Sequence, residues 1–234
     1  MTLRGFLVPF VGVFGVISVV VTLAACGGSA SKSSPLGPGR EELRAGAYVL
    51  DLVARDRAGT GPAQLPKIEL TVPDGWFNYK GIAVGKGEKV PQTAFVFFWH
   101  VDQVYPTPCK WAGKPLVDPG RGVDGLAFAL ANQPLRHATV PTDIELAGFR
   151  GKYLRLSVPT NIDFDDCDEG YFESWTADGW ASDRYQQKPG QVDRIWILDV
   201  DGQRLVIDAA YLPEATAQDR AELERVVDSI RFLD

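Results

Sequence analysis

One short acidic segment holds the residue types that most readily bind a hard cation. The stretch NIDFDDCDEGYF, residues 161–172, places a single cysteine, Cys167, among five carboxylates. Calcium takes about six to eight oxygen ligands, and alternating aspartates often supply them. Asp163, Asp165 and Asp168 could provide three of these ligands, but the spacing departs from the EF-hand pattern of glycine and glutamate positions. A solvated acidic loop is the favoured interpretation, and a weak calcium site is the alternative. The five carboxylates are Asp163, Asp165, Asp166, Asp168 and Glu169.

The role of Cys167 depends on the compartment, which the N-terminal residues indicate. Residues 1–25 carry one charge, Arg4, before a nearly uninterrupted apolar run, as is typical of a signal peptide. A run of about 20 apolar residues would also suffice for a transmembrane anchor. The motif LAAC, which ends this run at Cys26, resembles the lipobox of bacterial lipoproteins. The resemblance implies cleavage immediately before Cys26 and a lipid anchor on its thiol, with acyl chains such as palmitate.

The segment that follows the apolar run has the composition of a linker. Residues 26–39 are rich in Gly, Ser and Pro, and Lys32 is their only charge. Such a segment cannot bury enough apolar surface to fold. We therefore expect a flexible tether that holds a single domain, residues 40–234, at the outer face of the cell membrane through the lipid.

With Cys26 assigned to the lipid, two cysteines remain, Cys109 and Cys167. In an oxidising compartment outside the cytoplasm, this pair favours a disulfide over a metal site. The bridge would join residues 58 positions apart. For a loop of that length, the chain-entropy treatment gives a stabilisation of about 4 kcal/mol.

Charge and motifs exclude several classes of function. The formal net charge of −6 argues against nucleic acid as a partner. His100 and Asp102 could share one face of a strand, but the chain has no G-x-S-x-G turn to supply a nucleophilic serine. P-loop, Rossmann, C-x-x-C and H-E-x-x-H motifs are also absent from the sequence. The sequence therefore indicates no catalytic residue, metal or cofactor, and a hydrolase with an unrecognised site remains an alternative.

Aromatic residues near the two cysteines offer a possible binding surface. If the disulfide forms, the residues around Cys109 and those after Cys167 meet in space. Aromatic side chains in loops can stack on sugars or bind a protein partner. The alternative is an apolar cluster that seals the long loops. Residues 171–191 have weak periodicity and read as a long loop, and long ordered loops are often functional. The candidate surface comprises Trp111, Tyr171, Trp175 and Trp180.

Strands must position most of these candidates. Residues 67–76 alternate apolar and polar side chains, and residues 45–53, 142–148 and 152–158 also read as extended. Residues 93–102, TAFVFFWHVD, form a dense apolar and aromatic run, which predicts a central strand covered on both faces.

Two helices interrupt the strands. An apolar stripe at helical spacing predicts a helix within residues 122–134, and a second stripe predicts a helix over residues 216–230 with Thr216 as its N-cap. Before the second helix, Asp201-Gly202 suits a tight turn between two strands. The predicted fold is α+β: a mostly antiparallel sheet with two short helices packed on it, and a C-terminal β-hairpin followed by a helix.

Longer segments resemble a broad group of uncharacterised actinobacterial cell-envelope lipoproteins. The lipobox, AGAYVLDL with LTVPDGW, and the ending RIWILDVDGQRLVIDAAY…ELERVVDSIRF carry this resemblance. The C-terminal half also loosely resembles the PsbP/Mog1-type α+β sandwich. The resemblance implies an envelope address and brings no catalytic signature with it.

The favoured hypothesis is a lipid-anchored binding or scaffolding module. Its aromatic loops would contact an envelope protein or a cell-wall glycan. An extracytoplasmic hydrolase and a carrier of an apolar ligand are the alternatives. A pocket containing paired carboxylates would favour the hydrolase, an apolar cavity would favour the carrier, and an exposed aromatic patch without a pocket would favour the binding module.

Overall fold

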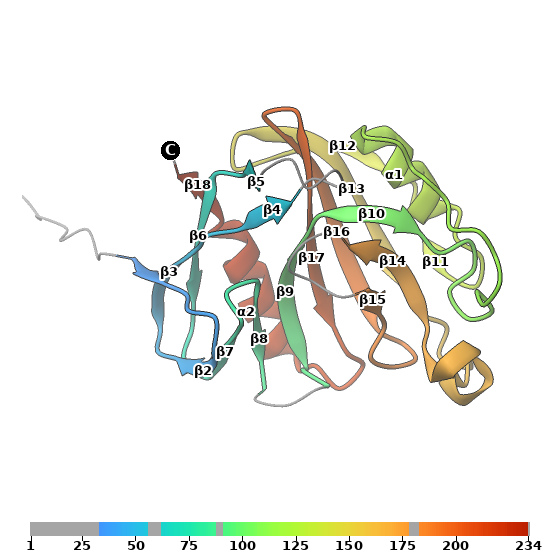
Figure 1. The fold of residues 1–234 in the computed structure, drawn as a ribbon. Coiled ribbons are helices and arrows are strands. Elements are labelled where there is room, and N and C mark those ends of the chain that lie inside the picture. The colour runs from blue at the N-terminus through green and yellow to red at the C-terminus, as the bar shows by residue number, and fades with distance from the viewer. Residues whose placement is uncertain (1–32, 56–61, 88–90, 178–182, 234) are drawn as a thin grey trace, which may run out of the picture. The chain divides into compact units, whose positions relative to one another are not determined.

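A nine-stranded antiparallel sheet lies at the centre of the fold (Figure 1). The structure is a computed structural model that describes residues 33–55, 62–87, 91–177 and 183–233. Cys26, Trp180 and the signal peptide lie outside the described residues. Along the sheet, the strands are β11 (His137–Ala138), β13 (Phe149–Ser157), β16 (Val192–Val200), β17 (Gln203–Tyr211), β9 (Ala94–Trp99), β8 (Ala83–Lys86), β7 (Trp76–Tyr79) and β2 (Arg40–Leu43), and β12 (Thr142–Leu146) pairs with β13.

Smaller sheets and two α-helices complete the described fold. A four-stranded sheet contains β1 (Ser34–Pro35), β3 (Gly46–Leu50), β6 (Lys67–Val72) and β18 (Arg231–Leu233). A three-stranded sheet contains β10 (Val101–Val104), β14 (Glu173–Ala177) and β15 (Arg184–Tyr185), and β4 (Val53–Arg55) pairs with β5 (Pro62–Gln64). The helices are α1 (Val123–Ala131) and α2 (Ala217–Asp228), with short 3-10 turns η1 (Phe164–Asp166) and η2 (Asp168–Gly170).

The predicted class is confirmed: a mostly antiparallel sheet with two helices. Both helices lie within their predicted ranges, and Thr216 caps α2 as expected. Its Oγ1 accepts a hydrogen bond from Asp219 N at 3.0 Å, and Asp219 Oδ2 accepts one from Thr216 N at 2.9 Å. This reciprocal capping box satisfies two backbone donors that the first turn leaves open. No described helix has both the length and the apolar character needed to cross a membrane.

The C-terminal part of the chain supplies two neighbouring nine-residue strands, β16 and β17, and then α2. β16 and β17 pair in continuous register from Val192↔Tyr211 to Val200↔Gln203. Asp201 and Gly202 connect them with φ values of 53° and 82°, the left-handed region that suits a two-residue turn. After α2 the chain adds β18, which pairs with β6 in the smaller sheet.

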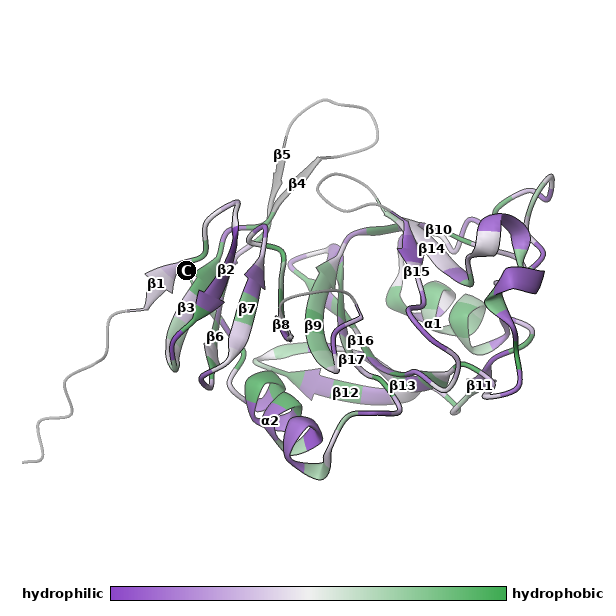
Figure 2. Cartoon of the chain, turned by 90° about the horizontal axis from the view of Figure 1, so that it is seen from below, coloured by the Kyte–Doolittle hydropathy of each residue, from purple (hydrophilic) through white to green (hydrophobic). Residues whose placement is uncertain are grey.

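The two faces of the large sheet cover two different apolar cores. On one face, α2 and the four-stranded sheet pack over a cluster that includes Trp196 and Leu223. On the opposite face lie α1 and the β10–β14–β15 sheet (Figure 2). They pack over a cluster that includes Trp175 and Leu130. Alternating side chains on each strand belong to alternate cores because successive Cβ atoms point to opposite faces.

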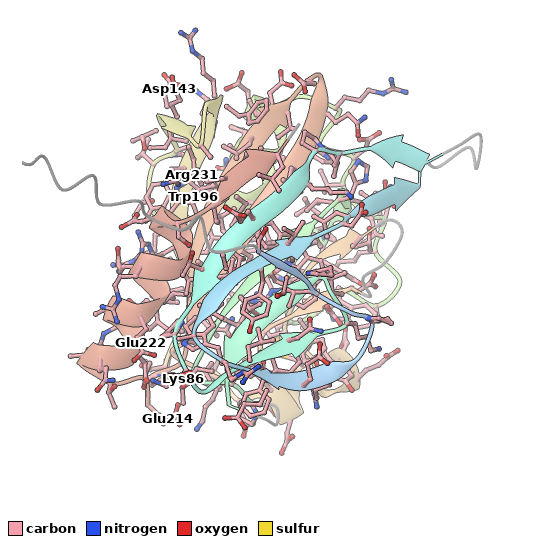
Figure 3. The ribbon with its side chains drawn as sticks, turned by 90° about the vertical axis from the view of Figure 1, so that its left-hand side faces the viewer. Lys86, Asp143, Trp196, Glu214, Glu222 and Arg231 are labelled. Carbon is pink, nitrogen blue, oxygen red and sulfur yellow. A yellow bond between two sulfur atoms is a disulfide. The ribbon has the colours of Figure 1, made fainter. Side chains whose placement is uncertain are left out.

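Charged and polar contacts fix α2 against the sheet. Lys86 Nζ, on β8, lies 2.7 Å from Glu222 Oε2 and 2.9 Å from Asp219 Oδ1. Trp76 Nε1 donates to the same Glu222 oxygen at 3.1 Å. Lys86 and Glu222 meet between β8 and α2 (Figure 3). These contacts set the position of the helix along the sheet, in addition to its apolar stripe.

Two predictions about organisation need correction. The expected tether, residues 26–39, overlaps the fold: β1 pairs in parallel with β3, and Leu36 N donates to Val49 O at 2.8 Å. Residues 171–191 were expected as a long loop, but they contain β14 and β15. In both places, pairing with distant strands supplies backbone partners that local composition does not reveal.

Candidate functional site

The central strand β9 presents aromatic rings on the face opposite α2. Its apolar neighbours Ala94, Val96 and Phe98 join the α2-side core, so the intervening residues must point the other way. Strand β9 is central as predicted, with β17 and β8 as neighbours. On the second face Phe95 and Trp99 are buried, at 3% and 4% exposure, and Phe97 is half-buried. The side chains that point away from α2 are Phe95, Phe97 and Trp99.

A glycine on β8 makes room for these rings. Gly85 lies directly opposite Phe95. A Cβ atom at this position would lie 3.0 Å from Phe95 Cβ and 3.2 Å from Tyr79 Cε2. Both distances are below ordinary van der Waals contact, so any larger residue would push the rings out of place.

The rings form the floor of a cleft of about 590 Å³. Phe97 and Trp99 stack with ring centroids 4.2 Å apart, and Trp99 contacts the buried Trp175 edge-on at 5.7 Å. The volume lies within the range of roughly 300–1,000 Å³ that is usual for small-molecule sites. The described lining residues are Arg40, Tyr79, Lys80, Ile82, Ala83, Gln92, Phe95, Phe97, Trp99, Asp183, Arg184, Tyr185 and Gln187.

Positive charge gathers at one edge of the cleft. Arg40 and Lys80 are both exposed, and the Arg40 guanidinium carbon lies 4.6 Å from the centre of the Tyr79 ring. This contact holds the Arg40 side chain against the cleft, because cations favour the face of an aromatic ring. The edge is cationic in a chain whose formal net charge is −6.

A buried charge network forms the opposite wall. Arg184 Nε lies 2.7 Å from Asp208 Oδ2, and Arg184 Nη2 lies 3.0 Å from Asp193 Oδ1. Arg136 Nη2 lies 2.5 Å from the second Asp193 oxygen. All four side chains are buried. The two positive and two negative charges balance, so the network needs no further counterion and can hold the Arg184 plane over Phe95 at 5.2 Å.

Amide and hydroxyl groups extend this network. Gln191 Nε2 donates to Asp193 Oδ1 at 2.6 Å, and both Gln186 and Arg136 bond to the Ser174 hydroxyl. Burial raises the pKa of Asp208 to about 6, against the opposing effect of the Arg184 guanidinium. With a pKa of about 6 and an ion pair to Arg184, Asp208 is mostly ionised at pH 7, so the wall stays charged.

One acidic side chain behind the wall is not part of the balanced network. Glu173 is 7% exposed, and its Oε2 has no hydrogen-bond partner among the described residues. Burial, with the neighbouring Asp183 carboxylate, raises the pKa of Glu173 to about 7. Glu173 is not among the described residues that line the cleft. Its raised pKa therefore does not supply a proton donor to a ligand in the cleft.

The structure pairs the two cysteines as expected. Cys109 and Cys167 form a disulfide, with their Cα atoms 4.5 Å apart. Val158 and Phe172 pack with the bridge in a small buried cluster. The bridge therefore belongs to the hydrophobic support of the loop that carries η1 and η2.

The predicted aromatic binding surface needs correction. Trp175 is completely buried and belongs to the α1-side core, because β14 pairs with β10 and turns its side chain inward. Trp111 is half-buried and contacts Tyr105 edge-on. Tyr171 is 44% exposed, and Trp180 lies outside the described residues. Of the four candidates, only Tyr171 is shown at the surface.

The candidate calcium ligands do not converge. Asp163 accepts a hydrogen bond from Asp165 N and so begins η1. Asp168 accepts one from Ala112 N at 2.7 Å, which lowers the pKa of the Asp168 carboxyl. Among the described residues, no group of three or more His, Cys, Asp or Glu is arranged to hold a metal ion. Backbone N–H groups already bond to the Asp163 and Asp168 carboxylates.

Neither histidine takes part in the cleft. His100 lies between β9 and β10, Asp102 lies on β10, and His137 is exposed on β11. None of the three is among the described residues that line the cleft. The described lining contains one carboxylate, Asp183, and it accepts a hydrogen bond from Tyr105 at 2.7 Å.

Comparison with other proteins does not assign the chain to a family. No protein-family model matches the chain, and no curated protein matches it either. The geometry of the cleft is therefore the basis for the function proposed below.

Proposed function

We propose that the chain is a binding protein that holds a small amphipathic ligand, with a flat apolar body and an acidic group, in the cleft over β9. One observation carries the proposal: an aromatic floor, cleared by Gly85, ends at the cationic pair Arg40 and Lys80. The apolar body would lie on Phe97, the half-buried ring of the floor, which stacks on the buried Trp99. The acidic group would face the cationic edge.

The remaining surroundings favour binding over catalysis. A hydrolase needs a nucleophile or a pair of free carboxylates at the substrate. The described lining has only the Asp183 carboxylate, which Tyr105 already engages. A fixed wall of buried charges limits rearrangement of the cleft, which lowers the entropic cost of holding a ligand.

The proposed location is the outer face of the cell membrane, through a lipid on Cys26. The LAAC motif behind an apolar run supports this location. The disulfide agrees with an oxidising compartment. A carrier anchored in this way would collect or release its ligand at the membrane surface.

A second candidate function concerns two exposed tyrosines beside the cleft wall that carries Arg184. Tyr171 and Tyr185 are 44% and 38% exposed, and their ring centroids lie 5.3 Å apart. Exposed aromatic pairs of this kind can stack on sugars. A cell-wall glycan or an envelope protein is the corresponding partner, and Tyr185 would join that surface to the cleft.

The ligand class can be tested with two matched probes. The full chain is reconstituted in nanodiscs of zwitterionic lipid, and binding of 2-naphthoate and of 2-naphthalenemethanol is measured by titration calorimetry. The two probes share a flat body and differ in the acidic group. We expect naphthoate to bind roughly threefold to tenfold more tightly, because an exposed ion pair contributes about 1 kcal/mol.

Two variants locate the binding. Phe97→Ala should weaken both probes roughly tenfold through loss of the aromatic floor. Arg40→Gln should remove the preference for naphthoate and leave the alcohol unchanged. Phe128→Ala is the matched control, since Phe128 is 70% exposed on α1. Equal binding by Phe97→Ala and wild type would refute the cleft as the site.

A further inference from the structure

A second pocket, distinct from the cleft, collects three arginines from three elements. It has a volume of about 270 Å³ and lies between α2 and the strands β13, β16 and β17. Arg155 comes from β13, Arg194 from β16 and Arg220 from α2. The other lining residues are Tyr153, Tyr211, Leu223 and Glu224.

This pocket lies on the opposite face of the large sheet from the cleft. Arg194 pairs with Ala209, and Ala209 pairs with Val96, so the three side chains share the α2-side face. Phe95 and Phe97 flank Val96 and therefore point to the other face. The sheet itself separates the two sites, and a change in one should leave the other intact.

The fold places these positive charges where positive charge is unfavourable. Arg155 and Arg194 are direct cross-strand partners, and like charges in this arrangement repel. Arg220 lies in the first turns of α2, where the positive end of the helix dipole disfavours a cation. Strands β13 and β16 and helix α2 therefore each place an arginine where repulsion between positive charges, or with the helix dipole, is unfavourable.

Local contacts hold two of the three guanidinium groups, those of Arg194 and Arg220, in this arrangement. Arg194 Nε donates to Tyr153 Oη at 3.4 Å, and its guanidinium carbon lies 5.0 Å from the Trp196 ring centre. Arg220 Nη1 donates to Ala215 O at 2.8 Å and lies beside the Tyr211 ring. Arginines held in advance lose less freedom when they bind an anion.

Only part of the positive charge is compensated within the pocket. Arg194 Nη1 lies 2.6 Å from Glu224 Oε1, the single carboxylate among the described lining residues. Three guanidinium groups and one carboxylate leave a net charge of +2. A phosphate group carries nearly two negative charges at neutral pH and accepts the paired hydrogen bonds that arginine donates.

We infer that this pocket binds the phosphate group of a phosphomonoester, as a site separate from the proposed ligand cleft. Arg155 and Arg194 supply the cross-strand pair of donors, and Arg220 closes the group from α2. The same chemistry occurs in free phosphate and in the head group of phosphatidic acid.

The test begins with inorganic phosphate as the probe. Calorimetry on the full chain in zwitterionic nanodiscs should give a dissociation constant of about 1 mM or tighter. Arg155→Gln and Arg194→Gln should each weaken binding at least fivefold. Arg225→Gln is the control, because Arg225 is exposed elsewhere on α2 and does not line the pocket.

A fourth variant separates an anion site from a purely structural cluster. Glu224→Gln removes the competing carboxylate and should tighten phosphate binding roughly threefold to tenfold. A structural cluster predicts no tightening. Arg155 is exposed, so Arg155→Gln remains informative if Arg194→Gln fails to fold.

Nanodiscs that contain phosphatidic acid identify the source of the phosphate. If they abolish binding of added phosphate in wild type, the lipid head group is the occupant; if they leave it unchanged, the occupant is a soluble phosphate. The inference is overturned if wild type does not bind phosphate, if the Arg155 and Arg225 variants bind equally, or if Glu224→Gln binds more weakly.

Discussion

Replacement of Glu173 by glutamine should stabilise the protein at alkaline pH and leave its stability unchanged in acid. Glu173 is 7% exposed, and burial raises its pKa from 4.5 to about 7. Above pH 7 the wild-type side chain must therefore carry a charge in a buried position. Glutamine has nearly the same shape and stays neutral, so it avoids that cost.

The magnitude follows from linkage between protonation and folding. The folded pKa of Glu173 is higher than its unfolded pKa, so the folded state binds the proton more tightly. The contribution of Glu173 to the free energy of unfolding is therefore largest below about pH 4 and is lost as the pH rises to about 7. A pKa difference of about 2.5 corresponds to about 3 kcal/mol as a ceiling, and residual contact with water reduces this to about 2 kcal/mol.

Urea unfolding of the full chain at pH 4 and pH 8 measures the effect. The difference in unfolding free energy between Glu173→Gln and wild type should be near zero at pH 4 and about 2 kcal/mol at pH 8. Glu145→Gln is the control, because Glu145 is exposed on β12. An equal difference at both pH values would show that the side chain acts through shape or hydrogen bonding and would refute the argument from burial.

Two further variants test the disulfide and the floor of the cleft. The double variant Cys109→Ala, Cys167→Ala should lower the free energy of unfolding by about 4 kcal/mol, because the bridge closes a long loop. Urea unfolding with and without reductant measures this loss. A loss below about 1 kcal/mol in the variant would contradict the prediction. Gly85→Ala should cost about 1–3 kcal/mol and weaken naphthoate binding, since the added methyl group meets Phe95 and Tyr79. Gly46→Ala, where the nearest atom to the new Cβ lies 3.8 Å away, is its control in both thermal unfolding and calorimetry.

Local patterns in the sequence predicted the elements that carry most of the fold. The apolar run around Phe97 predicted β9, the stripe ending at Ile230 predicted α2, and Thr216 predicted the start of that helix. In each case, the pattern that identifies the element lies within a short stretch of the chain. The disulfide followed instead from chemistry: two cysteines were left once the lipobox resemblance had accounted for the third.

The cleft could not be predicted in the same way, although a partial signal existed. Alternation within β9 puts Phe95, Phe97 and Trp99 on one face, and a run with aromatics at every second position could have indicated an aromatic surface. The wall had no such signal. Arg184 lies on a two-residue strand, and its partners Asp193 and Asp208 come from β16 and β17. Only the tertiary fold brings them together.

The buried aspartates show why this wall is informative about function. Asp208 interrupts the apolar run VIDAA on β17, and its cross-strand neighbours are Phe97 and Ile195. An apolar residue there would avoid the cost of burying charge, and such replacements often stabilise proteins by about 1–4 kcal/mol. The charged pairs fix an orientation: Asp208 holds Nε and Asp193 holds Nη2 of Arg184 beside the cleft. If only the stability of the sheet mattered, an apolar residue at this position would stabilise the protein more. Charged pairs that allow a single arrangement favour instead a cleft of constant shape.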